Sequence, residues 1–146
     1  MNYIQLNQKD LFDFKNTEYK FAHCISKDYK LGAGIAKQFC KHFNMRNRLI
    51  NSINEGIKPK VPGCVFIDPV FNLITKDRYF HKPTYDSLSG SLYEMKQLSI
   101  DMNINKIVMP QIGCGLDGLK WSKVKKIIYE HFNDLDIEIV VCCFKK

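Results

Sequence analysis

The sequence predicts a single α/β domain in which helices cover both faces of a sheet. Three observations lead to this prediction: strand-like and helix-like segments alternate, no low-complexity linker or fixed-period repeat interrupts them, and 146 residues is an ordinary domain length. A composition of 45% hydrophobic and 25% charged residues favours a packed core over disorder. We therefore expect one domain over residues 1–146.

Short apolar runs rich in β-branched and aromatic residues predict the strands. The expected strands span residues 1–6, 19–25, 64–67, 70–75, 106–109 and 137–144. A turn is expected at 10–14, and Asp68-Pro69 marks a turn or bulge between the third and fourth strands. Apolar residues three or four positions apart predict the helices. The expected helices span residues 34–43, a stretch around 45–53, 84–102 and 121–132.

The chain is basic, with 22 Lys and Arg against 15 Asp and Glu and a net charge of +7. Residues 1–60 hold 11 basic and 5 acidic side chains, a net charge of +6, whereas residues 61–146 hold 11 and 10. This asymmetry is compatible with an anionic partner and equally with a solvated lysine-rich face.

The six cysteines form no Cys-x-x-Cys pair and no zinc-type spacing with histidine, so we expect neither disulfides nor a metal site. Residues 1–10 do not resemble a signal peptide. No apolar run reaches the ~20 residues of a membrane span. We expect an intracellular protein of the cytoplasm or nucleus, with no membrane partner.

Two Gly-x-Gly loops, 32–34 and 113–115, each follow an expected strand and precede an expected helix. Such loops can hold phosphate, because glycine lets backbone N–H groups converge and the helix N-terminus adds positive charge. Two of them suggest a diphosphate, although each is as easily an ordinary tight turn. Neither matches the Gly-x-Gly-x-x-Gly or Walker pattern, which disfavours an oxidoreductase or a nucleoside triphosphatase.

Two polar residues are candidates for chemistry. Lys76 ends an apolar strand, where desolvation would favour a neutral, nucleophilic amine; a solvated lysine is the alternative. Asp117 follows the second glycine loop, where it could take a proton, hold a hydroxyl or simply cap a turn.

These segments together resemble the macrodomain family, and more narrowly its terminal ADP-ribose protein glycohydrolase branch. The resemblance rests on residues 22–26, 32–36, 73–76, 81–85 and 110–117, which occur in the family's order along nearly the whole chain. It implies a three-layer α/β/α sandwich with a central mixed sheet that binds ADP-ribose at the strand ends. Nothing in the sequence demands a cofactor, a metal or more than a monomer.

The resemblance also implies an activity. Lys76 would attack C1″ of the distal ribose and Asp117 would accept the proton, which releases mono-ADP-ribose from glutamate or aspartate esters and deacylates O-acyl-ADP-ribose. Asp10 would reach the adenine amino group, Leu11 would line the adenine pocket, and Phe144 would contact adenine or pack in the core. The other implied ligand contacts are His23, Cys24, Ser26, Gly32, Ala33, Gly34, Ile35, Thr84, Pro110, Gln111, Ile112, Gly113, Cys114, Gly115 and Leu116.

The sequence departs from the family at Lys9, where a glycine usually precedes the Asp-Leu-Phe segment. A related hydrolase branch that positions a water with an Asn-Ala-Ala-Asn stretch is not matched, since residues 23–26 read His-Cys-Ile-Ser. Two alternatives to a protein-directed hydrolase stay open. One is a hydrolase of DNA-linked ADP-ribose whose basic residues 1–60 hold the strand; the other is a non-catalytic reader of ADP-ribosylated protein.

Overall fold

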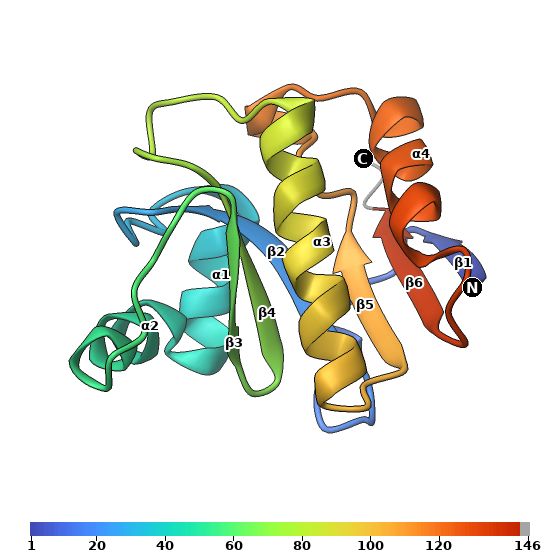
Figure 1. Cartoon of the computed structure of the whole chain (residues 1–146), viewed down its shortest axis with the longest axis horizontal. Helices are drawn as coiled ribbons and strands as arrows, with labels where there is room; N and C mark the ends of the chain where they lie inside the picture. Colours follow the sequence, from blue (N-terminus) through green and yellow to red (C-terminus); the bar gives the residue numbers. More distant parts are fainter. Residues whose placement is uncertain (144–146) are drawn as a thin grey trace.

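The computed structural model describes residues 1–143 and has three layers, with one six-stranded sheet between two groups of helices (Figure 1). The strands are β1 (Asn2–Asn7), β2 (Lys20–Ser26), β3 (Gly63–Ile67), β4 (Val70–Lys76), β5 (Lys106–Pro110) and β6 (Glu138–Cys143). The helices are α1 (Gly34–Phe43), α2 (Met45–Asn54), α3 (Tyr85–Asp101) and α4 (Trp121–Phe132), with 3₁₀ helices η1 (Leu11–Phe14) and η2 (Gly115–Asp117).

The strand order is β1-β6-β5-β2-β4-β3, and every neighbouring pair is parallel except β3 with β4. The two antiparallel strands can form a hairpin because only Asp68-Pro69 separates them. The predicted three-layer α/β/α sandwich with a mixed sheet is confirmed. Parallel strands place their carboxyl ends at one edge, which is where ligands bind in open α/β sheets.

Alternating side chains of the strands divide the core into two halves. Phe71 and Leu73 of β4 pack with residues of α3 and α4, whereas Val70 and Ile74 pack with residues of α1, α2 and η1. Burial of each large apolar side chain contributes roughly 1.5–3 kcal/mol, so the sheet is held firmly from both sides. The loops at its carboxyl edge are therefore mounted on a rigid frame.

The predicted elements agree with the observed ones to within one or two residues. The helix expected at 84–102 is α3, whose N-cap is Thr84, and the turn expected at 10–14 is η1. The last strand is described as far as Cys143, and Phe144 lies outside the described residues. Among residues 1–143, we find no helix long and apolar enough to cross a membrane.

Candidate active site

A cleft of about 900 Å³ opens at the carboxyl ends of β2, β4 and β5. Its walls come from the loop between β2 and α1, the segment between β4 and α3, and the loop between β5 and α4. Three chain segments that are distant in the sequence thus surround one volume, as expected at this edge of a parallel sheet.

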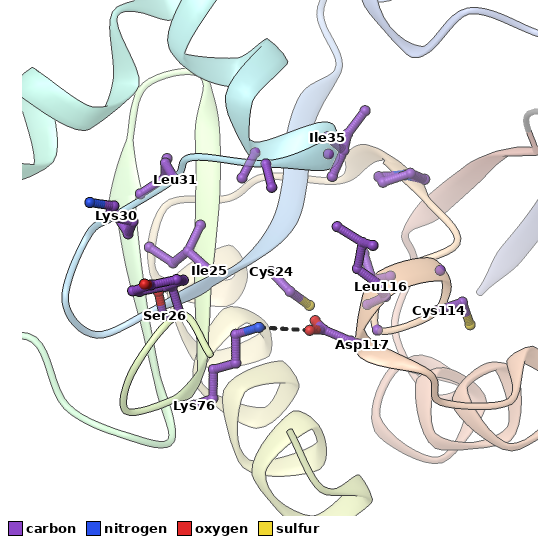
Figure 2. A pocket seen from close by; sticks show the side chains of 18 of the residues that line it. Cys24, Ile25, Ser26, Lys30, Leu31, Ile35, Lys76, Cys114, Leu116 and Asp117 are labelled. Atoms are coloured by element: carbon purple, nitrogen blue, oxygen red, sulfur yellow. Dashed lines mark hydrogen bonds and ion pairs between the residues drawn. The ribbon is translucent and has the colours of Figure 1, made fainter. Parts of the chain in front are cut away.

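Lys76 and Asp117 face each other in this cleft (Figure 2). Lys76 is the last residue of β4 and Asp117 the last of η2, and the distance from Lys76 Nζ to Asp117 Oδ1 is 2.7 Å. The side chains are only 15% and 16% exposed. Partial removal from water strengthens their attraction. The pair brings an amine and a proton-accepting carboxylate together at a site open to a ligand.

The two glycine loops line the cleft and approach each other, since a Cβ at Gly34 would lie 3.4 Å from Leu116 Cδ1. Gly34, Gly113 and Gly115 adopt φ values of 59°, 74° and 68°, a left-handed region that L side chains rarely adopt. Helix α1 begins at Gly34, and its N-cap Ala33 forms no side-chain cap hydrogen bond. The N–H groups in the first turn of this ten-residue helix are therefore free of a side-chain cap and can bind an anion.

Three cysteines line the same cleft: Cys24, Cys114 and Cys142. Burial raises the pKa of the Cys24 and Cys114 thiols, and it raises the pKa of Cys142 to about 11. A thiol must ionise to act as a nucleophile, and the raised pKa values disfavour ionisation. These three side chains therefore form an apolar part of the cleft wall. All six cysteines are free thiols.

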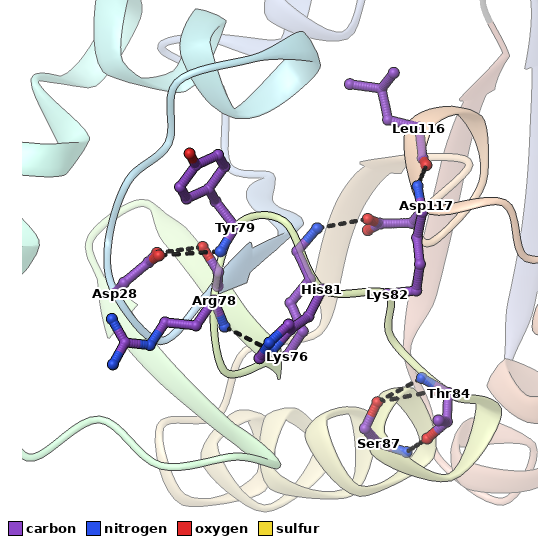
Figure 3. A network of polar contacts seen from close by, with 11 residues as sticks. Asp28, Lys76, Arg78, Tyr79, His81, Lys82, Thr84, Ser87, Leu116 and Asp117 are labelled. Atoms are coloured by element: carbon purple, nitrogen blue, oxygen red, sulfur yellow. Dashed lines mark hydrogen bonds and ion pairs between the residues drawn. The ribbon is translucent and has the colours of Figure 1, made fainter.

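The segment between β4 and α3 is tied to both neighbouring loops (Figure 3). Asp28 accepts hydrogen bonds from the Tyr79 N–H at 3.0 Å and from Ser26 Oγ at 2.5 Å. Burial opposes ionisation of Asp28, but these hydrogen bonds, a third from the Lys30 N–H and the charge of Arg78 lower the pKa of its carboxyl. On the opposite side, Lys82 Nζ donates to the Leu116 carbonyl.

Most of the predicted site residues line the cleft together with the ion pair. They are Cys24, Ser26, Gly32, Ala33, Gly34, Ile35, Pro110, Gln111, Ile112, Gly113, Cys114, Gly115 and Leu116. The structure thus brings these residues together around one cleft, and their contacts with ADP-ribose stay predictions.

His23 requires a correction, because its side chain does not line the cleft. The ring is 0% exposed, stacks on Phe39 with centroids 3.8 Å apart, and its Nε2 lies 2.6 Å from Asn72 Oδ1. Burial lowers the pKa of His23 to about 4. Successive side chains of a strand point to opposite faces of the sheet. Cys24 therefore packs with the core half beneath α3 and α4, whereas His23 packs against Phe39 on the other face.

Three other predicted residues also lie outside the cleft lining. Thr84 caps α3, where it forms a reciprocal capping box with Ser87 (Figure 3). Leu11 is buried in the core beneath α1 and α2. Asp10 caps η1 by accepting the Phe12 N–H at 3.0 Å.

Several lining residues were not predicted from the sequence, among them Lys30, Leu31, Gln38, Tyr79, Phe80 and Cys142. Two consecutive aromatic residues in a polar loop were the available signal for Tyr79 and Phe80. Within residues 1–143, no cluster of three or more His, Cys, Asp or Glu side chains could hold a metal ion.

Comparisons with known proteins identify the class. The chain is 41% identical over 137 residues to ADP-ribose glycohydrolase OARD1 of Homo sapiens, which covers 90% of this chain and 86% of the human protein. OARD1 of Bos taurus matches with the same identity and coverage. No protein-family model matches the chain.

Solved structures share the fold. The macrodomain of Mycobacterium tuberculosis DarG has a TM-score of 0.83 at 19% identity and covers 97% of this chain and 98% of its own. Thermosipho africanus DarTG in complex with ADP-ribose has a TM-score of 0.80 at 16% identity, covering 98% of this chain and 42% of its own. The fold is that of a macrodomain. Among macrodomains, the chain belongs to the family of ADP-ribose glycohydrolase OARD1.

Proposed function

We propose that this chain is an ADP-ribose-binding hydrolase that removes mono-ADP-ribose from glutamate and aspartate side chains and deacylates O-acyl-ADP-ribose. The observation that carries the proposal is the 2.7 Å ion pair between Lys76 and Asp117 within the cleft. The glycohydrolase name of the OARD1 relatives supports it, as does the ADP-ribose complex of DarTG.

The glycine loops are suited to the diphosphate of ADP-ribose. Residues 32–35 and 113–116 line the cleft and can direct backbone N–H groups, together with the α1 N-terminus, toward phosphate oxygens. The distal ribose would then lie at Lys76 and Asp117. The adenine would lie toward Cys142, which β6 contributes to the cleft lining.

The reaction uses the ion pair as a nucleophile with its proton acceptor. Asp117 accepts a proton from the Lys76 ammonium, which leaves a neutral amine. The amine lone pair forms a bond to C1″ of the distal ribose while the bond from C1″ to the ester oxygen breaks, and the carboxylate leaves. Water then hydrolyses the covalent lysyl adduct, releasing ADP-ribose and restoring the amine. A simple acyl group on C1″ leaves as a carboxylate in the same way.

Replacement of either partner tests this mechanism. Lys76→Ala removes the nucleophile, and we expect the rate of ADP-ribose release from a glutamate-linked peptide to fall at least about a thousandfold. Asp117→Ala removes the proton acceptor and should cost about 10²- to 10⁴-fold. Chromatographic detection of released ADP-ribose under single-turnover conditions measures both.

Lys96→Ala is the matched control, because Lys96 pairs with Asp134 at 3.4 Å away from the cleft lining. It should release ADP-ribose at the wild-type rate. Activity that survives in Lys76→Ala contradicts the covalent step. A wild-type protein that binds ADP-ribose but releases none from any substrate is a reader instead.

The DNA-directed alternative receives weaker support from the structure. Helices α1 and α2 carry Lys37, Lys41, Arg46 and Arg48 and no acidic residue. However, Arg46 Nε donates to the Tyr29 carbonyl at 3.1 Å, and Arg48 donates to two backbone carbonyls, so both arginines stabilise the fold. The rates of ADP-ribose release from a thymidine-linked DNA substrate and from the glutamate-linked peptide distinguish the DNA-directed from the protein-directed hydrolase. Faster release from DNA, at a rate that falls as salt is added, would favour the DNA-directed alternative.

A further inference from the structure

The cleft extends beyond the region assigned to ADP-ribose. In Figure 2, Ile35, Cys114 and Leu116 lie on one side of the ion pair, and Ser26, Lys30 and Leu31 lie on the other. The first side carries the loop at 113–116 and the N-terminus of α1 for the diphosphate. The second side is therefore left for whatever is attached to C1″ of the distal ribose.

We propose that this second side binds the peptide chain carrying the modified carboxylate and prefers an acidic segment. Its main residues are Lys30, Tyr79 and Phe80, which we call the acceptor subsite. The inference rests on the proposed function, since it assumes that C1″ lies at Lys76. It assigns these residues a role in substrate specificity, distinct from the chemistry of the ion pair.

Two exposed rings form the rim of the acceptor subsite. Tyr79 is 56% exposed and Phe80 is 67% exposed, and both line the cleft three and four residues after Lys76. The ring centroids lie 5.3 Å apart at an interplanar angle of 89°. Large aromatic side chains next to a cleft are typical of contact surfaces, where they supply much of the binding energy.

The backbone that carries the two rings is held in place before any partner arrives. Asp28 accepts the Tyr79 N–H, the His81 N–H donates to the Arg78 carbonyl at 3.0 Å, and Lys82 ties the end of the segment to Leu116 (Figure 3). A segment fixed at both ends loses little conformational entropy on binding. The subsite is thus preorganised.

The charge of the acceptor subsite favours an acidic partner. Lys30 Nζ lies 5.6 Å from the Tyr79 ring centroid, and Lys30 forms no ion pair within residues 1–143. The segments 26–30 and 76–82 around it carry five basic residues against two acidic ones, Asp28 and Asp77, so positive charge is in excess there. Complementary charge would therefore come from the substrate.

The ring geometry favours a peptide over a nucleobase. Stacking of a base requires an open, flat aromatic face. Here Lys30 lies over the Tyr79 ring, Tyr79 and Phe80 are perpendicular, and the Phe80 and His81 rings meet at 74°. The rings form a corner, which suits the backbone and side chains of an extended peptide.

Binding measurements test the subsite without requiring turnover. In a Lys76→Ala background, which lacks the nucleophile and so preserves the ester, calorimetry compares free ADP-ribose with a mono-ADP-ribosylated glutamate peptide that has acidic flanks. Adding Tyr79→Ala with Phe80→Ala should reduce the preference for the peptide over ADP-ribose about tenfold. Lys30→Gln should reduce the preference for acidic over neutral flanks about threefold. Tyr93→Ala, which alters a half-exposed tyrosine on α3 outside the cleft lining, should change neither ratio.

An unchanged ratio in the Tyr79, Phe80 double variant, or an equal loss for peptide and ADP-ribose, overturns the acceptor subsite. A loss seen only with a base-linked ADP-ribosylated oligonucleotide would assign the rings to a nucleobase and overturn the peptide proposal. Failure of the proposed function has a different signature. In that case the wild-type protein binds the modified peptide but does not cleave it, and the ratios remain measurable.

Discussion

His23 lies between Phe39 and Asn72, and full burial determines what its ring can do. The ring donates or accepts through Nε2, while Nδ1 has no hydrogen-bond partner within the described structure. An added proton would have to be carried in the core without a counter-charge. The side chain therefore contributes to stability in its neutral form only.

A pH dependence of stability follows. The pKa of His23 is lowered from 6.5 to about 4, so between these values the unfolded chain binds a proton that the folded chain does not. The free energy of unfolding should therefore decrease as pH falls, by about 2 kcal/mol between pH 7 and pH 5 for this group alone. Urea unfolding of wild type and His23→Gln at both pH values measures the difference, since glutamine does not titrate.

The matched control is His81→Gln, because His81 is exposed. It should lose stability on acidification to the same extent as wild type. If His23→Gln shows the wild-type pH dependence as well, the buried neutral histidine is not the cause.

At the level of elements, the loop that carries Asp117 depends on glycine. A Cβ at Gly113 would lie 2.9 Å from Leu119 Cδ1 at a φ of 74°, whereas one at Gly118, with a φ of 78°, would meet nothing within 4 Å. The two positions therefore share the backbone strain and differ in the clash. This makes them a matched pair for testing how accurately the loop must be placed.

We expect Gly113→Ala and Gly118→Ala each to lower the free energy of unfolding by about 1–2 kcal/mol through left-handed strain. Only Gly113→Ala should also weaken ADP-ribose binding about tenfold, because moving Leu119 displaces the phosphate-binding loop. Chemical denaturation and calorimetry give the two quantities. Equal losses of affinity in both variants would argue against a role for the clash.

The sequence predicted the elements well because each is specified locally. Apolar spacing along residues 84–102 predicts α3, and Thr84 with Ser87 begins it by a local capping box. The roles of Thr84 and His23 were harder to predict. A position beside a motif does not reveal which face of a strand or which end of a helix its side chain occupies.

For the whole molecule, ADP-ribose would connect three loops that follow β2, β4 and β5. A ligand that contacts all of them binds only the folded chain, so it stabilises the entire domain. This coupling can be measured without knowing the physiological substrate.

At a ligand concentration one hundred times its Kd, ADP-ribose should raise the free energy of unfolding by about 2.7 kcal/mol and the Tm by roughly 5–10 °C. Thermal unfolding followed by circular dichroism measures the shift. Lys96→Ala should show the wild-type shift, and Gly113→Ala a smaller one at the same ligand concentration. The absence of a shift in wild type would contradict ADP-ribose binding in the cleft.

The sequence by itself determined the α/β class, the elements, and the lysine and aspartate that could supply the chemistry, because periodicity and motif order are properties of neighbouring residues. The tertiary structure alone decided which of these residues meet. Lys76 and Asp117 are 41 positions apart, and only the order of β2, β4 and β5 in the sheet brings them to 2.7 Å. The same packing buries His23 and places Tyr79 and Phe80 at the cleft rim, since long-range contacts depend on how strands and helices assemble.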